Sequence, residues 1–288
     1  MAQETELPAG ETPRPVNAAK PVRASHSALL RVRGHLTPRT DFLIGLFGMG
    51  VLLVAWLVLT SGKEPILKPL FLPSPLGIWD GLADFQRRGW LTQAIGRSFG
   101  RVTLSLVLVT LVGAPIGIIM GAFAPVDALL RKIINGGKSI PTTGLIGLIV
   151  LWFSIEERAK IVFLFLGAIF YMIILVKNAI LNVNEDYLRV ALDIGASPAQ
   201  VVTKVLLPSA LPQIWDAIAV CNGIMWTYIV LAEFINASEA QMGLGYLLYI
   251  GSRTNESGKV FGTLIVIALI SSLTDWLFQT IRKRYLNW

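Results

Sequence analysis

The sequence has little charge, almost no histidine and a single cysteine. Only 15% of its 288 residues are Asp, Glu, Lys or Arg, while 54% are apolar. Soluble domains carry about 25% charged residues, so this chain has too few charges to cover a water-facing surface. The net charge of +7 therefore does not indicate a soluble enzyme or a nucleic-acid-binding module.

The scarce residue types exclude several kinds of site. One cysteine, Cys221, excludes a disulfide framework and a cysteine-based zinc site. The two histidines, His26 and His35, both lie near the N-terminus. The body of the chain therefore has no histidine for catalysis or metal binding, and we predict no catalytic residue and no metal ligand.

Apolar residues are concentrated in six long runs. A helix needs roughly 20 mostly apolar residues to cross a bilayer. The runs are residues 42–60, 102–123, 140–153, 161–176, 217–235 and 260–278. The third reaches spanning length only if its helix begins near residue 133, and the fourth only if it continues to residue 180. The sequence predicts an all-α polytopic membrane protein with six transmembrane helices in one domain, residues 42–288.

Two segments outside these runs are predicted to differ from them. Residues 1–41 are rich in Pro, Ala, Thr and Arg and lack a sustained apolar period, which indicates a flexible tail. They do not form a cleavable signal peptide, because the first apolar run starts too deep in the chain. Between the first two runs, prolines 73 and 75 break any helix, and residues 76–90 mix apolar with charged residues, as an interfacial helix does.

The orientation follows from lysines and arginines near the ends of the runs. An even number of spans puts both termini on one side of the membrane. The arginines of the tail, and Arg282, Lys283 and Arg284 near the C-terminus, favour both termini in the cytoplasm. Arg97 and Arg101 at the outer start of the second span oppose this bias.

The second span carries a row of glycines. Gly113, Gly117 and Gly121 are spaced by four residues, so they lie on one face of a helix where another backbone can approach closely. Ordinary helix packing explains this row. Pro115 within it is expected to kink the helix or to be compensated by a neighbour.

The polar stretch 182–212, between the fourth and fifth spans, predicts a first short helix. Tyr187, Val190, Ala191 and Ile194 have helical spacing. Gly195 can adopt the positive φ that ends a helix.

A second short helix is expected directly after this turn. Ser197 can cap it, Pro198 suits its first position and Gln200 completes a capping box. Pro208 is expected to stop it. Two helices around a glycine turn form a structured unit rather than a plain linker.

This unit resembles the cytoplasmic loop of ATP-binding-cassette (ABC) importer permeases. In that family the motif reads Glu-Ala-Ala, three residues, Gly, nine residues, Ile, one residue, Leu-Pro. Here Gly195 is followed after nine residues by Val205 and then by Leu207 and Pro208. Ala191 matches the last alanine of the motif, while Arg189 replaces its acidic residue.

Other segments resemble the nitrate, sulfonate, taurine and bicarbonate importers within that family. They are Leu-Pro-Ser-Pro at 72–75, Gly-Ala-Pro-Ile-Gly at 113–117, Lys-Ser-Ile-Pro at 138–141, Ala-Glu at 232–233 and Gly-Leu-Gly-Tyr at 243–246. Their order along residues 42–286 matches the family, so the resemblance covers most of the chain.

The resemblance implies a type I importer-like permease in a bacterial inner membrane, carrying a small solute such as nitrate, a sulfonate, taurine or bicarbonate. Two permease subunits, expected to be identical, would pair. Each would contact a cytoplasmic ATPase, which uses ATP and Mg²⁺, while this chain binds no cofactor. A periplasmic or surface solute-binding protein would deliver the substrate. The coupling residues implied are Arg189, Ala191, Gly195, Ser197, Val205, Leu207 and Pro208.

The fifth span has a polar face with two interpretations. Asn222, Trp226, Ile229 and Glu233 lie on one side of a helix. Intramembrane polar residues usually face a bundle interior or a water-filled path. This face either lines the translocation route, or Asn222 bonds to a neighbouring helix and Glu233 reaches the outer interface.

Lys138 also has two interpretations. The segment 136–139 resembles part of a phosphate-binding loop, but the first glycine of that motif would fall on Lys132. Lys138 therefore either extends to the interface or pairs with a carboxylate, or it contacts the substrate.

The alternative function is a secondary transporter or channel that works alone. That class predicts internal repeats and broken helices with buried charges, and the sequence shows no convincing repeat. An intramembrane enzyme would need a reactive cluster within the spans, and no histidine lies there.

Overall fold

The computed structural model describes residues 37–62, 66–235 and 239–286. The chain divides into two compact units, residues 1–55 and residues 56–288. Across the described ranges every regular element is a helix, which confirms the predicted all-α class.

The described part of the first unit is helical. Helix α1 (Pro38–Thr60) begins four residues before the predicted span, and the backbone N–H of Thr40 donates to Thr37 Oγ1 over 3.3 Å. Of the tail predicted over residues 1–41, residues 1–36 lie outside the described residues.

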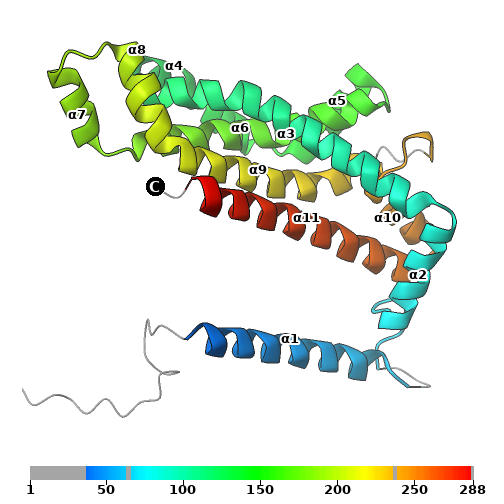
Figure 1. Cartoon of the computed structure of the whole chain (residues 1–288). Coiled ribbons are helices and arrows are strands. Elements are labelled where there is room, and N and C mark those ends of the chain that lie inside the picture. The colour runs from blue at the N-terminus through cyan, green and yellow to red at the C-terminus, as the bar shows by residue number, and fades with distance from the viewer. Residues whose placement is uncertain (1–36, 63–65, 236–238, 287–288) are drawn as a thin grey trace, which may run out of the picture. The chain divides into compact units, whose positions relative to one another are not determined.

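The second unit is a bundle of long helices, α3, α6, α9 and α11, that run side by side (Figure 1). Figure 1 places α7 and α8 at one end of this bundle and α2 and α10 at the other. The bounds are α2 Pro75–Arg87, α3 Trp90–Ala122, α6 Glu157–Leu181, α7 Glu185–Asp193, α8 Pro198–Val201, α9 Leu207–Ile235, α10 Leu244–Arg253 and α11 Ser257–Tyr285.

Helices α3 and α6 pack closely along the predicted glycine row. A Cβ on Gly117 would lie 2.7 Å from the carbonyl oxygen of Ile173, and a Cβ on Gly113 would lie 2.8 Å from Met172 Cγ. Gly121 is crowded in the same way by Ile180. The prediction of a close helix–helix approach is confirmed, because any side chain at these positions would push α6 away.

The third predicted span is broken. Helix α4 (Ala124–Ser139), a short 3₁₀ turn (Thr142–Leu145) and helix α5 (Ile146–Phe153) replace a straight helix, with a bend of 84°. Ile140 is extended, with φ −71° and ψ 122°, because Pro141 disfavours a helical conformation in the residue before it. The prediction of one continuous helix from residue 133 is therefore wrong.

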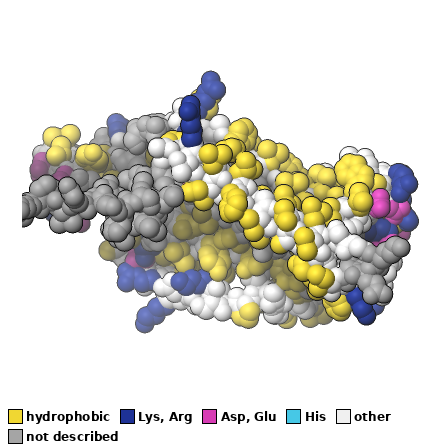
Figure 2. Space-filling view, turned by 90° about the horizontal axis from the view of Figure 1, so that it is seen from below, with side chains coloured by type: hydrophobic (Ala, Val, Ile, Leu, Met, Phe, Trp, Pro, Cys, Tyr) yellow, Lys and Arg dark blue, Asp and Glu magenta, His cyan; other side chains and the backbone are white. Residues whose placement is uncertain are grey.

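Five described helices are long and apolar enough to cross a membrane, and the bent pair α4–α5 makes a sixth if it counts as one span. The predicted six spans agree with this count when the bent pair is taken as one span. Figure 2 shows apolar side chains exposed over much of the surface, with acidic and basic side chains clustered at the right of the view.

Helix α2 is amphipathic, as predicted for residues 76–90. Ile78 and Phe85 are buried, while Leu76 and Trp79 are 75% and 70% exposed. Ser74 caps the helix by accepting a hydrogen bond of 3.2 Å from the Gly77 N–H. The buried face of α2, which includes Ile78, packs against the start of α11.

An ion pair joins α2 to α11. Lys259 Nζ lies 2.8 Å from an oxygen of Asp84 and 2.7 Å from one of Glu256. The hydrogen bond from Lys259 holds the pKa of the Asp84 carboxyl below its ordinary value of 3.8. A hydrogen bond from the same lysine also lowers the pKa of Glu256.

Candidate functional site

A rigid elbow lies at the α7–α8 end of the bundle (Figure 1). Gly195 has φ +83°, and two hydrogen bonds of 2.9 Å close the turn, from Ala196 N to Ala191 O and from Gly195 N to Leu192 O. This pattern is a Schellman motif. The predicted glycine turn is confirmed.

The second half of the elbow carries the predicted capping box. The Ser197 N–H donates to Gln200 Oε1 over 2.8 Å, and the Gln200 N–H donates to Ser197 Oγ over 3.4 Å. Pro198 occupies the first helical position. The two helices are therefore held at a defined angle by backbone geometry and caps.

The helix does not stop at Pro208, so that prediction is wrong. Helix α8 passes through a π-helical turn (Val202–Leu206) directly into α9, in which Pro208 is the second residue and Pro212 lies inside the helix. The Leu207 N–H donates to Val202 O, five residues back. This wider turn directly before Pro208 makes room for a ring that would collide with a carbonyl of an ordinary α-helix.

The residues expected to couple to an ATPase lie together on this elbow and differ in exposure. Arg189 is exposed and pairs with Glu185 at 3.1 Å on its own helix. Ala191 is buried inside the elbow. Ser197 and Pro208 are exposed, and Val205 and Leu207 are half-buried.

One face of the elbow exposes apolar side chains. Tyr187, Val190 and Ile194 are 59%, 61% and 80% exposed. Since large apolar side chains in a contiguous patch on a structured element mark an interaction surface, this face suits contact with another protein.

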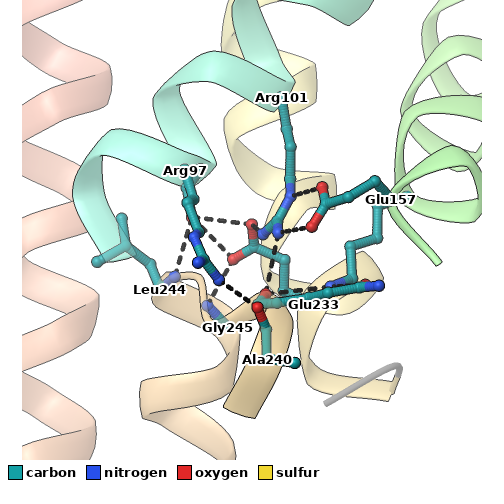
Figure 3. A network of polar contacts seen from close by, with 10 residues as sticks. Arg97, Arg101, Glu157, Glu233, Ala240, Leu244 and Gly245 are labelled. Carbon is teal, nitrogen blue, oxygen red and sulfur yellow. Dashed lines mark hydrogen bonds and ion pairs between the residues drawn. The ribbon is translucent and has the colours of Figure 1, made fainter. Parts of the chain in front are cut away.

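A charge network lies at the other end of the bundle (Figure 3). Arg101 of α3 is 4% exposed and donates to both carboxylate oxygens of Glu157, the first residue of α6. Its Nη1 also lies 2.5 Å from Glu233 Oε1 of α9. One guanidinium thus connects three long helices.

Glu233 is fully enclosed. It is 1% exposed, accepts from Ser98 Oγ at 2.8 Å and accepts from the Gly245 N–H at 2.9 Å. A Cβ at Gly243 would collide with its carboxylate. Figure 3 shows the carboxylate between α3 and the start of α10.

Two more cations surround this network. Lys160 is 1% exposed and donates to the backbone oxygen and Oε1 of Gln241, over 3.2 and 3.0 Å. Arg97 donates to Ala240 O over 2.6 Å. The network therefore fixes the loop before α10 against α3 and α6.

Sequence reasoning missed this network. Its signal was Arg101, which stands on the side of the membrane that the distribution of lysines and arginines disfavours. A buried ion pair explains the position, since Arg101 serves packing rather than orientation.

The predicted polar face of α9 is packed within the chain. Asn222 is 4% exposed and donates to Thr274 Oγ1 of α11 over 2.9 Å, as the second interpretation expected. Trp226 is 1% exposed, and its indole N–H has no acceptor among the described residues. Glu233 is paired with Arg101 rather than reaching the interface. A role for these residues in lining a route stays a prediction.

Within the residues that the structure describes, no three His, Cys, Asp or Glu side chains gather as metal ligands would.

Comparison with known proteins gives concordant results. Residues 113–287 match the family described as binding-protein-dependent transport system inner membrane component. The chain is 30% identical over 268 residues to the taurine transport system permease protein TauC of Escherichia coli, covering 91% of this chain and 95% of that protein.

Two further relatives carry other substrate names. The putative aliphatic sulfonates transport permease protein SsuC of Bacillus subtilis is 28% identical, covering 87% of this chain and 89% of its own. The nitrate import permease protein NrtB of Leptolyngbya laminosa is 26% identical, covering 81% and 84%.

Solved structures show the same fold. An inward-facing conformation of the MetNI methionine ABC transporter aligns with a TM-score of 0.62 at 21% identity, covering 69% of this chain and 97% of that chain. A bacterial ABC transporter for the acidic polysaccharide alginate aligns with a TM-score of 0.56 at 16% identity, covering 86% and 97%.

Proposed function

The chain belongs to the family of inner-membrane components of binding-protein-dependent transport systems, and we propose that it is the membrane-spanning subunit of an ATP-driven importer of small anions. A separate ATPase drives its alternation between inward and outward openings through residues 195–208. The chain itself does not hydrolyse ATP.

The exposed apolar elbow carries this proposal. Val190 and Ile194 offer an apolar surface on a unit whose turn is closed at Gly195 and whose second helix is capped at Ser197. A flexible loop would change its own conformation when a partner moves against it. A capped and packed elbow instead moves as a rigid unit and transmits the motion to α9. ATP and Mg²⁺ belong to that partner.

The other parts of the assembly follow from the family. Two copies of this chain pair in the bacterial inner membrane, each contacts one ATPase subunit, and an external solute-binding protein delivers the substrate. The charges of Arg282, Lys283 and Arg284 favour a cytoplasmic C-terminus, and six spans put the N-terminus on the same side.

The substrate class follows from the named relatives. Taurine, aliphatic sulfonates and nitrate share an anionic group with several equivalent oxygen atoms. We expect this chain to carry an anion of that kind.

The interaction is tested by co-purification of this chain with its ATPase subunit. Ile194→Lys should abolish co-purification, because it places a charge in the apolar contact. Ile66→Lys is the matched control, since Ile66 is 71% exposed and precedes α2 at the opposite end of the bundle. Equal retention of the ATPase by both variants would contradict the proposed contact.

Transport is tested in vesicles that contain this chain, the ATPase and the binding protein. Uptake of taurine, an alkanesulfonate or nitrate should require all three components and ATP. Uptake by this chain alone would instead support a channel or secondary transporter.

A further inference from the structure

The break between α4 and α5 lies near the middle of the membrane. A Cβ on Gly137, at the end of α4, would collide with the ring of Phe170, and Thr142 lies beside Gly167. Phe170 stands about 20 Å from the first residue of α6 and about 17 Å from its last, at 1.5 Å per residue. The break is thus level with the centre of a spanning helix.

The backbone at this break is exposed. Pro141 and Thr143 are exposed and Ile140 is 50% exposed. At the end of α4 the regular helical hydrogen bonds give way to single contacts, from Ser139 Oγ to Asn135 O and from the Ile140 N–H to Gly137 O. Irregular backbone at this depth is not tolerated against lipid, only against protein or water. The break therefore faces either another protein surface or a water-filled space.

The surroundings of Lys138 help to decide between a protein surface and a water-filled space. It is exposed and has no hydrogen-bond or ion-pair partner among the described residues. At the level of Phe170 it lies too deep for its head group to reach an interface, because half of the hydrocarbon core is about 15 Å thick. An ammonium group at this depth needs water or a counter-charge.

A second copy of the chain offers few free carboxylates in the described helices α3–α6, α9 and α11. Four of their five acidic residues are ion-paired within their own chain, and the fifth, Asp275, accepts a hydrogen bond from the uncharged amide of Gln279. The ion pairs are Asp127 with Lys177, Glu157 and Glu233 with Arg101, and Asp216 with Arg282. Water, an anion passing through it, or Asp275 of a second copy is the counterpart left for Lys138.

A cavity of about 280 Å³ opens beside the break. Lys138 and Thr142 line it together with Trp152, Leu148 and Phe170. A basic group beside mostly apolar walls matches a small organic anion that has an acidic head and a short apolar stem.

We propose that the break between α4 and α5 lines the water-filled route of the transported anion, and that Lys138 attracts the anionic head there. This inference rests on the proposed function and adds the residues that meet the substrate at mid-depth. Because identical subunits pair symmetrically, each route would contain this lysine twice.

The first experiment measures water access without requiring transport. In a Cys221→Ala background, Lys138→Cys and Leu269→Cys are placed singly in the full chain in membranes with its ATPase. Leu269 is 64% exposed and lies near the middle of α11. The probe is 2-sulfonatoethyl methanethiosulfonate, a membrane-impermeant sulfonate.

Lys138→Cys should react at least about tenfold faster than Leu269→Cys, because only a thiol in water ionises to the reactive thiolate. Slow reaction of Lys138→Cys, at a rate no higher than that of Leu269→Cys, would overturn the assignment of the break to a water-filled route. Fast reaction at both positions would show that Leu269 also faces water and would still support the assignment.

The second experiment measures the role of the charge. Lys138→Gln should lower the rate of ATP-dependent taurine uptake at least about tenfold, while Lys138→Arg retains most of it. Equal uptake by the two variants would overturn the role of the lysine. Gel filtration with the ATPase shows that each variant is folded. If the unsubstituted complex imports none of the tested anions, the proposed function fails, but the labelling result still stands.

Discussion

The ion pairs of Arg101 allow us to rank how much Arg101, Glu157 and Glu233 each contribute to the free energy of unfolding. By geometry alone the bidentate contact with Glu157 looks the stronger, since the contact with Glu233 uses a single nitrogen. Burial reverses this order. The Glu157 side chain is 46% exposed and that of Glu233 only 1%, so water screens the first pair and not the second.

The expected loss of unfolding free energy depends on which charged group each substitution leaves buried without a partner. Arg101→Gln leaves Glu233 buried without its cation and should cost about 3–5 kcal/mol of unfolding free energy. Glu233→Gln leaves Arg101 still paired with Glu157 and should cost about 1–3 kcal/mol. Glu157→Gln should cost less than about 1 kcal/mol.

The assay is unfolding of the purified subunit by SDS in mixed micelles, followed by tryptophan fluorescence. Arg97→Gln is the matched control, because Arg97 lies one helical turn from Arg101 and makes one exposed hydrogen bond to Ala240 O. It should stay within about 1 kcal/mol of the parent protein.

The reasoning is refuted if Glu157→Gln destabilises the subunit as much as Glu233→Gln. Such a result would mean that contact geometry outweighs burial at this site. A large loss in the Arg97→Gln control would instead show that any arginine substitution at this end disturbs the fold.

Three further predictions concern other parts of the chain. Gly195→Ala should reduce substrate-stimulated ATP hydrolysis in the assembled complex, because alanine is strained at the positive φ of the elbow; full stimulation would contradict the role of the turn. Gly117→Leu should prevent stable packing of α3 on α6, whereas Gly96→Leu should be tolerated, since no atom lies within 4 Å of a Cβ at Gly96; thermal stability in detergent compares the two. The depressed pKa of Asp84 means that its pair with Lys259 stabilises the fold above the ordinary pKa of 3.8 and is lost as the pH falls through the lower folded value; Asp84→Asn should therefore flatten the acid limb of a plot of midpoint temperature against pH, and an unchanged limb would refute this.

Local features were predictable from the sequence where neighbouring residues determine them. The turn at Gly195 and the cap at Ser197 depend on residues within a few positions, and both are confirmed. The close helix packing predicted from the glycine row around Gly117 is also confirmed. It was predictable because glycines repeated every four residues place a surface without side chains on one face of a helix.

Features that depend on tertiary structure were not predictable in the same way. Pro208 was expected to stop a helix, but a π-turn before it accommodates the ring. The bend after Ser139 follows from Pro141, yet the apolar run around it masked the break. The partner of Arg101 lies 132 residues away, and no local pattern names it.

The unbroken helical path from Pro198 to Phe234 makes α9 a lever arm. The 37 residues of this path, from Pro198 to Phe234, measure about 55 Å, so a tilt of about 5° at the elbow moves the far tip by about 5 Å. That tip carries Glu233, which is fastened to Arg101 and Ser98. Any tilt at the elbow would therefore displace this tip by several ångströms and would carry α3 with it.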